Sequence, residues 1–392
     1  MITKPLLFLK KLYKKLKKFK VNIIFKLPLN SDVIIYDEIK ENIIRDYLPT
    51  SKKIFVIKNR EFCFYIIPIL LLNTFKNLLN KELIFLILVN GLKKGFLRYF
   101  KDSLDASIIN HIKPKLVITY IDNNPRFGRL SLKFEGIRFI AIQNGCRSRW
   151  ETKDECMHDL YLTYTKQEAK ALNKLGWKIK EAKNIGSINA ARVFTTLKNE
   201  KSKKDLLIIS SWRGNVEIDF DYLEQYKAMK EMHIFLNTLI NKENYSAGII
   251  MRSQRDDKDW FIKHFNLNEE QYYRNIYGNS FEIIENKTLG KDIYEEINRS
   301  NLSVSFLTSA ILEGYIYGHK CLYLNFYKND FYHQDFPKEL VISKDNKLLL
   351  ESEIKNKINK AIKQREDIFL SSKTKSKYTL NKFRTILNRN IN

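Results

Sequence analysis

KLVITYIDNNPRFGRLSLKFEGIRFIAIQNGCRSRW, residues Lys115–Trp150, contains two short β-rich runs that each end abruptly in polar residues. The first run, Leu116–Ile121, ends in Asp122–Pro125 (DNNP), and the second, Arg138–Ile142, ends in Gln143–Gly145 (QNG). In an open parallel α/β sheet, ligands bind in a crevice outside the carboxyl ends of the strands. The stretch therefore predicts two neighbouring strand ends that form the rim of one site.

The same alternation of apolar strands and helical segments continues on both sides of this stretch and predicts a Rossmann-like parallel sheet over residues 31–197. We read Phe62–Phe75 and Leu83–Val89 as further buried core elements, because neither has the 18–20 apolar residues that span a bilayer. The expected strands are Asp32–Tyr36, Ile54–Ile57, Leu116–Ile121, Arg138–Ile142, Asp159–Thr163 and Ala182–Ile185.

A charged segment without apolar periodicity, Lys198–Asp205, is the expected linker to a second set of strands at residues 206–348. A lysine-rich helical tail, residues 349–392, follows it. The fold class that we expect is α/β, with two Rossmann-like domains facing an interdomain cleft. The second set is expected at Leu206–Ile209, Gly248–Met251, Phe281–Ile284, Leu302–Phe306 and Cys321–Leu324, with a long helix at about Tyr222–Leu239.

The net charge of +25 favours contact with an anionic partner, although part of it reflects a lysine-rich composition throughout the chain. Within the N-terminal segment, residues 1–30, the run Met1–Lys20 has leucines at three- and four-residue spacing and lysines on the other face. It predicts either a helix docked on an anionic membrane surface or a solvated helix covering the adjoining domain. It does not resemble a signal peptide, so we expect a cytoplasmic protein peripherally associated with the inner membrane.

Other classes of site lack their sequence signals. The four cysteines form no CxxC pair and suit reduced thiols, and neither they nor the six histidines have the spacing of a metal site. No nucleic-acid-binding signature, P-loop, GxSxG elbow or HExxH motif occurs. We therefore expect no metal, no cofactor and no nucleic acid.

The second half of the chain has its own candidate site in Ile297–Phe326. A strand ends at Thr308 and Ser309, whose hydroxyls suit the cap of the following helix. The same helix start is a seat for a phosphate. Glu313, one turn into this helix, is placed to accept hydrogen bonds from ribose hydroxyls.

Two of these patterns resemble known families. Strand–TSAxxEGxxxG–strand (Thr308–Gly318) resembles the donor-nucleotide site of GT-B glycosyltransferases and is similar to that of CDP-glycerol-type polyol-phosphate transferases. ITYIDNNPRF followed by FIAIQNGCR resembles bacterial lipopolysaccharide and capsule biosynthesis proteins. The resemblance covers roughly residues 30–345 and implies transfer of a sugar from a nucleotide-sugar donor to a surface glycan or lipid-linked acceptor. The histidine-centred tips usual in polyol-phosphate transferases are replaced here by IQNG and MRS.

The resemblance implies a role for each strand end. Asp122 is the candidate general base for the acceptor hydroxyl, or it only stabilises its loop as an Asx-type turn. Arginines match phosphate geometry, and the alternative for each is an ordinary surface ion pair. The predicted acceptor-binding residues are Asn123, Asn124, Gln143, Asn144, Gly145 and Arg147, with Arg149 as a further cation. The predicted donor-binding residues are Ser211, Arg213, Arg252, Thr308, Ser309 and Glu313.

No DxD motif occurs where it would suit the donor site, since Asp256-Asp257 lies in a highly charged loop. The resemblance thus implies a metal-independent enzyme, and a CMP-linked acidic sugar would suit so basic a cleft. Three alternatives remain at this point: a polyol-phosphate transferase, a non-catalytic GT-B-like binding protein and a nucleic-acid-binding protein.

Overall fold

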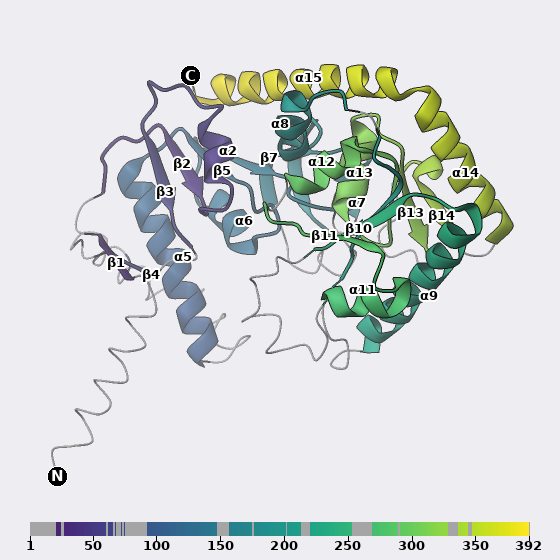
Figure 1. The fold of residues 1–392 in the computed structure, drawn as a ribbon. Helices are drawn as coiled ribbons and strands as arrows, with labels where there is room; N and C mark the ends of the chain where they lie inside the picture. Colours follow the sequence, from purple (N-terminus) through teal and green to yellow (C-terminus); the bar gives the residue numbers. More distant parts are fainter. Residues whose placement is uncertain are drawn as a thin grey trace, which may run out of the picture.

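The computed structural model describes most of the chain, including both predicted sheets (Figure 1). The predicted amphipathic segment Met1–Lys20 and the apolar run Leu83–Val89 lie outside the described residues. Among those residues, every helix is too short or too polar to cross a bilayer. The described residues are 21–24, 27–59, 62–65, 67, 72, 74, 92–146, 157–174, 176–200, 202–212, 220–252, 269–288, 291–327, 336–343 and 347–391.

The first sheet has six strands, all parallel, in the spatial order β3-β2-β5-β6-β7-β8. Its central strands read VIIY and LVIT and are buried along their whole length, as expected where helices cover both faces of a parallel sheet. The strands are β2 (Val33–Tyr36), β3 (Ile54–Ile57), β5 (Leu116–Thr119), β6 (Arg138–Ile142), β7 (Met157–Thr163) and β8 (Lys178–Asn184). The helices between them are α2 (Glu41–Arg45), α5 (Leu92–Ile112), α6 (Pro125–Ser131) and α7 (Lys166–Lys174), and α8 (Ile188–Thr196) follows the last strand.

The second sheet is also six-stranded and parallel, in the order β11-β10-β9-β12-β13-β14. This is the 3-2-1-4-5-6 order of a Rossmann fold, so the prediction of two Rossmann-like parallel sheets is confirmed. The strands are β9 (Lys204–Ile209), β10 (Ala247–Ile250), β11 (Glu282–Ile284), β12 (Ser300–Ser305), β13 (Cys321–Asn325) and β14 (Val341–Ser343). The helices are α9 (Phe220–Glu243), α11 (Glu269–Tyr277), α12 (Asp292–Asn298), α13 (Ser309–Ile316), η2 (Lys338–Leu340), α14 (Lys347–Lys363) and α15 (Arg365–Ile391).

A separate two-stranded parallel sheet pairs β1 (Val21–Ile24) with β4 (Phe62–Tyr65). The described beginning of the expected core element Phe62–Phe75 is therefore a strand outside the first sheet. The stretch is apolar enough for a core, but an apolar run of this length does not by itself reveal which sheet it joins.

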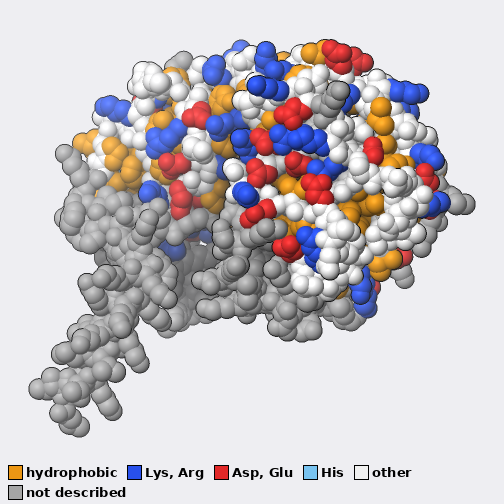
Figure 2. Space-filling view, viewed as in Figure 1, with side chains coloured by type: hydrophobic (Ala, Val, Ile, Leu, Met, Phe, Trp, Pro, Cys, Tyr) orange, Lys and Arg blue, Asp and Glu red, His pale blue; other side chains and the backbone are white. Residues whose placement is uncertain are grey.

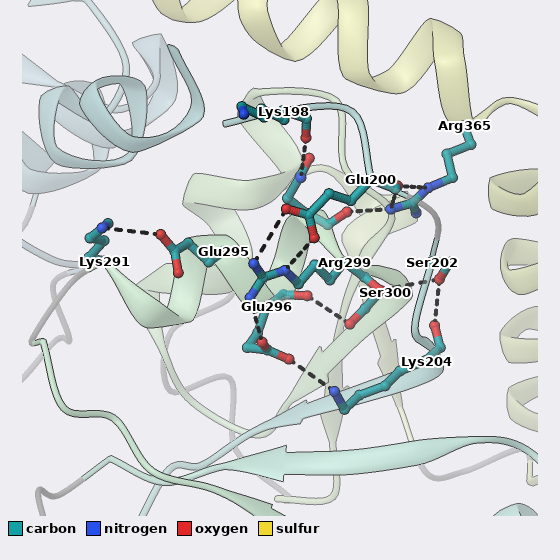
Figure 3. A network of polar contacts seen from close by, with 11 residues as sticks. Lys198, Glu200, Ser202, Lys204, Lys291, Glu295, Glu296, Arg299, Ser300 and Arg365 are labelled. Atoms are coloured by element: carbon teal, nitrogen blue, oxygen red, sulfur yellow. Dashed lines mark hydrogen bonds and ion pairs between the residues drawn. The ribbon is translucent and has the colours of Figure 1, made fainter. Parts of the chain in front are cut away.

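The expected linker Lys198–Asp205 is shorter than predicted, because its last two residues already belong to β9. Its remaining part is fixed to the second sheet and its helices (Figure 3). The Glu200 carboxylate accepts hydrogen bonds from the Arg299 guanidinium, and the Glu200 carbonyl accepts from Arg365 at 2.8 and 3.0 Å. The described part of this segment is therefore held by specific polar contacts and is not a solvated spacer.

The tail crosses from the second sheet back to the first. In Figure 1, α14 lies beside the second sheet and α15 runs along the top of the molecule to the helices of the first sheet. Phe383, Leu387 and Ile391 of α15 are fully buried in the same core cluster as β2 and β5. The last helix of the chain thus completes the hydrophobic core of the N-terminal sheet.

Candidate functional site

Each sheet has one point at which its connections diverge in opposite directions. In the first sheet this switch point lies between β2 and β5, and in the second it lies between β9 and β12. Open α/β sheets bind ligands in the crevice beyond the carboxyl ends of the strands at such points. The residues that follow these four strands are therefore the candidate ligand contacts.

At the second switch point, the two strand ends are joined by serine hydroxyls. Ser211 Oγ lies 2.9 Å from Ser305 Oγ and accepts a hydrogen bond from the Leu307 backbone N–H at 2.8 Å. Ser211 is buried. The predicted donor residue therefore shapes the loop that leads into α13.

The predicted helix start is in place, but the predicted cap is not made. The cap position of α13 is Thr308, whose side chain forms no cap hydrogen bond, and Ser309 is the first helical residue. The Thr308 carbonyl instead accepts from the Tyr323 hydroxyl at 2.5 Å. Capping was expected from residue type alone, and here the extended backbone of Thr308 is held by a neighbouring strand.

Glu313 lies at the contact between the two halves of the molecule. It is buried, and its Oε2 accepts hydrogen bonds from the Ser187 hydroxyl and from the Tyr294 hydroxyl at 2.5 Å. Ser187 follows β8 of the first sheet and caps α8 through Ala190 N at 3.2 Å. Its carbonyl accepts from Tyr317 at 2.7 Å. Glu313 was predicted to bind ribose. One oxygen of its carboxylate accepts hydrogen bonds from both halves of the molecule, from Ser187 at the start of α8 and from Tyr294 of α12.

The facing strand ends meet at a second place. Cys146, which follows β6, has its Sγ 3.9 Å from the Tyr323 hydroxyl of β13. The carboxyl ends of the strands in the two sheets therefore face one another, as predicted for two domains that share one site.

At the first switch point, Asp122 has no exposed surface. Its Oδ2 accepts a hydrogen bond from the Tyr161 hydroxyl at 2.6 Å, and its Oδ1 accepts from the Asn144 backbone N–H at 3.4 Å. The two polar strand ends predicted to form one rim thus lie side by side. In this arrangement the Asp122 carboxylate holds that rim together.

The neighbouring amides are also engaged with the backbone. Asn124 caps α6 by accepting from Arg126 N at 3.0 Å, and Asn123 is half-buried beside it. Gln143 is fully buried, accepts from Tyr164 N at 2.7 Å and donates to the Gly145 carbonyl at 3.0 Å.

Gly145, a predicted acceptor-binding residue, ends the polar QNG run after β6. It is absent from the glycines with positive φ, and a Cβ there would meet nothing within 4 Å. The backbone here therefore does not require a glycine, and the Gln143 side chain supports the turn by donating to the Gly145 carbonyl.

Of the predicted arginines, the structure describes only Arg252. Its side chain donates to the Trp212 carbonyl at 2.9 Å, and its backbone N–H donates to Glu269 at the same distance, so it joins the ends of β9 and β10 to α11. Arg147, Arg149 and Arg213 lie outside the described residues. No group of three or more histidine, cysteine or acidic side chains that suits a metal occurs in the part of the chain that is described.

Lys40 is a functional candidate that the sequence did not reveal. It follows β2 at the first switch point, and its ammonium lies 4.6 Å from the centre of the Tyr120 ring at the end of β5. Burial lowers the pKa of Lys40, and the nearby carboxylates of Glu313 and Asp122 oppose that shift. The only sequence signal was a lysine shortly after a strand end, in a chain with many lysines.

Comparison with known proteins identifies no family for this chain. No protein-family model matches it, and no curated protein matches it. Among solved structures, a putative UDP-N-acetylglucosamine 2-epimerase from Listeria monocytogenes gives a TM-score of 0.50 at 12% identity, covering 87% of this chain and 91% of that chain.

Other solved structures match at lower scores. Trehalose-6-phosphate synthase OtsA gives a TM-score of 0.47 at 10% identity, covering 92% of this chain and 99% of that chain. Two structures of the wall teichoic acid polymerase TagF give 0.42 at 12% identity and 0.43 at 10% identity, each covering 92% of this chain and 90% of that chain. At such identities the likeness concerns the fold alone: two Rossmann-like sheets with facing carboxyl ends, the GT-B-like architecture.

Proposed function

We propose that this chain is a GT-B glycosyltransferase that transfers a sugar from a nucleotide-sugar donor to a surface glycan or lipid-linked acceptor. The observation that carries the proposal is the pair of switch points on facing sheets: Lys40 and Tyr120, which follow β2 and β5, lie within electrostatic range of Glu313 in α13, which follows β12. Ligand sites on open α/β sheets form at such points. Two of them facing each other offer one wall to a donor and one to an acceptor.

The proposed reaction is a substitution at the anomeric carbon of the donor sugar. The acceptor hydroxyl oxygen forms the new bond to that carbon, and the bond to the donor phosphate oxygen breaks with its electron pair leaving on the nucleotide. We assign the proton of the hydroxyl to Asp122 as base. Charge on the departing phosphate would be stabilised by Arg213, Arg252 and the N-terminus of α13, since the partial positive charge of a helix start favours anions.

We assign the remaining predicted residues to the two walls of this site. The amides and hydroxyls among them suit sugar and ribose hydroxyls, which they bind without desolvating a charge of their own. The acceptor wall comprises Asn123, Asn124, Gln143, Asn144, Gly145 and Arg147. The donor wall adds Ser211, Thr308, Ser309 and Glu313.

Thermal-shift measurements against UDP-, GDP-, CMP- and CDP-linked sugars test donor binding. We expect at least one of these donors to raise the melting temperature, since ligands that bind only the folded state stabilise it. If none does while single-stranded RNA stabilises the protein, the transferase proposal fails. On the face shown in Figure 2, basic and acidic side chains of the described residues are interspersed and do not form the one-sided basic stripe typical of nucleic-acid binding.

Product analysis then separates transfer from other nucleotide-sugar chemistry. Incubation of the stabilising donor without acceptor should leave the sugar unchanged apart from slow hydrolysis, as followed by NMR. Conversion to an epimer of the same nucleotide sugar would replace the transferase with an epimerase. Transfer of a polyol phosphate from a CDP-linked donor would favour the polyol-phosphate alternative.

We propose that the protein acts at an anionic membrane surface through Met1–Lys20, where a lipopolysaccharide or capsule intermediate would be the acceptor. The support is the eight lysines and the spaced leucines of that segment. Deletion of Met1–Lys20 should lower sedimentation with phosphatidylglycerol-containing vesicles but not with neutral ones. Unchanged sedimentation with the anionic vesicles would contradict this part of the proposal.

A further inference from the structure

The ammonium of Lys40 has no hydrogen-bond or ion-pair partner among the residues that the structure describes. It lies over the face of the Tyr120 ring, 4.6 Å from the ring centre. The side chain is half-buried, so water cannot fully replace the missing partner. The part of the chain that the structure describes therefore leaves the donors of this ammonium available to a bound group.

The backbone that presents Lys40 is held in an unfavourable conformation. Lys40 has φ 54°, and Asp37, three residues earlier in the same loop, has φ 84°. Left-handed conformations are uncommon for residues other than glycine and are concentrated at binding and active sites. The Asp37 side chain accepts from Ile39 N at 3.0 Å and so fixes the loop locally. The loop after β2 is therefore built to place one lysine at the switch point.

The two carboxylates in the electrostatic range of Lys40 do not pair with it. Asp122 is engaged by Tyr161 and Asn144, and Glu313 by Ser187 and Tyr294. One carboxylate belongs to each half of the molecule, and both favour the charged form of Lys40. Burial lowers the pKa of Lys40, the two carboxylates partly offset that shift, and neither occupies the donors of the ammonium.

We propose that Lys40 holds an anionic oxygen, of a phosphate or a carboxylate, in the ligand that binds between the two sheets. This inference deepens the proposed function and rests on it. A charge-assisted hydrogen bond from an ammonium to such an oxygen satisfies the free donors, and the Tyr120 ring orients the side chain toward the site. A donor diphosphate and an acidic sugar both offer that oxygen.

The test compares Lys40→Met with a matched control, Lys113→Met. Lys113 also has a left-handed backbone, φ 52°, but is exposed and precedes β5 at the opposite edge of the sheet. Calorimetric titration of each full-length protein with UDP, pyrophosphate, glucuronic acid, uridine and glucose separates anionic from neutral ligands. Lys40→Arg is the conservative variant, and melting curves without ligand check that each variant is folded.

We expect Lys40→Met to weaken binding of the anionic ligand by about tenfold or more, as for the loss of a hydrogen bond to a charged group. Uridine or glucose should bind as before, Lys40→Arg should restore most of the affinity, and Lys113→Met should match the wild type. Loss confined to UDP and pyrophosphate identifies a donor phosphate, and loss confined to glucuronic acid identifies an acidic sugar.

Two results would overturn the inference. If the wild type binds an anionic ligand and Lys40→Met binds it equally well, Lys40 only balances the two carboxylates, while the transferase proposal stands. If the wild type binds none of the three anions, Lys40 is no anion site. Lys40-dependent binding of pyrophosphate without binding of any nucleotide sugar would keep this inference and remove the transferase.

Discussion

At the scale of single residues, Asp122 combines a predicted catalytic role with a structural position. A buried carboxylate that accepts from Tyr161 and from the Asn144 backbone joins three strands of the first sheet. A general base must come within hydrogen-bond reach of the acceptor hydroxyl. The catalytic role and the structural role predict different effects when Asp122 is substituted and when its hydrogen-bond donor Tyr161 is substituted.

We expect Asp122→Asn to lower kcat by about a hundredfold or more while donor affinity is retained, because an amide cannot take the acceptor proton. Tyr161→Phe removes the same 2.6 Å hydrogen bond and leaves the carboxylate present. It should cost about 1 kcal/mol of stability and little activity. Steady-state kinetics and urea unfolding of both variants provide the measurement. Equal losses of kcat in the two variants would remove Asp122 as the base and leave it as a support for the loop.

Asp105, in helix α5 beside the first sheet, has a strongly shifted pKa. Burial raises its pKa to about 6, although the Arg126 guanidinium and the Tyr36 hydroxyl both oppose the shift. The hydroxyl donates to Asp105 Oδ2 at 2.8 Å, and Arg126 lies at 3.1 Å. Since the folded state binds this proton more tightly than the unfolded state, the stabilising contribution is complete below pH about 4 and is lost as pH rises through about 6.

Carboxyl ¹³C NMR should therefore find Asp105 titrating near 6, well above an ordinary aspartate. Arg126→Met should raise this pKa further, and Tyr36→Phe should raise it by a smaller amount, because each removes a group that favours the charged form. A wild-type value near 4, or a fall in either variant, would contradict the burial argument.

At the scale of elements, the contact between α8, α13 and α15 depends on a glycine. Gly186 has φ +79°, and a Cβ there would lie 2.9 Å from the Tyr317 hydroxyl and 3.2 Å from Thr379 Oγ1. Neither neighbour moves freely. Tyr317 is bound to the Ser187 carbonyl, and Thr379 to the Ile185 carbonyl.

Gly186→Ala should destabilise the protein by about 2–4 kcal/mol, from the left-handed backbone and from crowding of these two side chains. Gly136→Ala is the matched control, since Gly136 has φ +82° and nothing within 4 Å of the added Cβ. It isolates the backbone part, about 1 kcal/mol. Denaturant unfolding should show a clear difference between the two variants, and equal values would mean that the contact yields without cost.

The elements themselves could largely be predicted from the sequence. Runs such as VIIY and LVIT combine β-branched residues with abrupt polar ends, so strand position follows from local composition. The adjacency of the DNN and QNG ends follows from the rule for parallel strands. Gly145 shows the limit, because its turn depends on the Gln143 side chain and not on glycine conformation.

At the scale of the whole molecule, the contacts between the two sheets could not be predicted. Ser187 and Glu313 are 126 positions apart in the sequence, and the residues around each of them do not indicate that the two side chains form a hydrogen bond. The sequence around Lys40 likewise contains no signal of its role, because Lys40 approaches Tyr120 only once β2 and β5 pair in the folded sheet. A helix such as α15 shows an apolar stripe in sequence, but that stripe does not say which core receives it.

The destination of α15 leads to a prediction about how the two halves hold together. Phe383 is fully buried among residues of the first sheet, yet its helix starts beside the second. Phe383→Ala should therefore lower stability by about 3–5 kcal/mol, as expected for a large cavity in a core. Hydrogen exchange should rise along α8 and the central strands of the first sheet, while β9 and β12 stay protected.

Tyr378→Ala is the control on the same helix, because Tyr378 is 65% exposed and its loss should change stability by less than about 0.5 kcal/mol. If Phe383→Ala instead increased exchange in both sheets together, the two sheets would unfold as one cooperative unit. In that case α15 would not stabilise the first sheet separately from the second. If it deprotected neither, the helix would be held by the Thr379 and Lys382 hydrogen bonds to the β8–α8 turn alone. Selective exposure of the first sheet is the result that fits a last helix completing the first core.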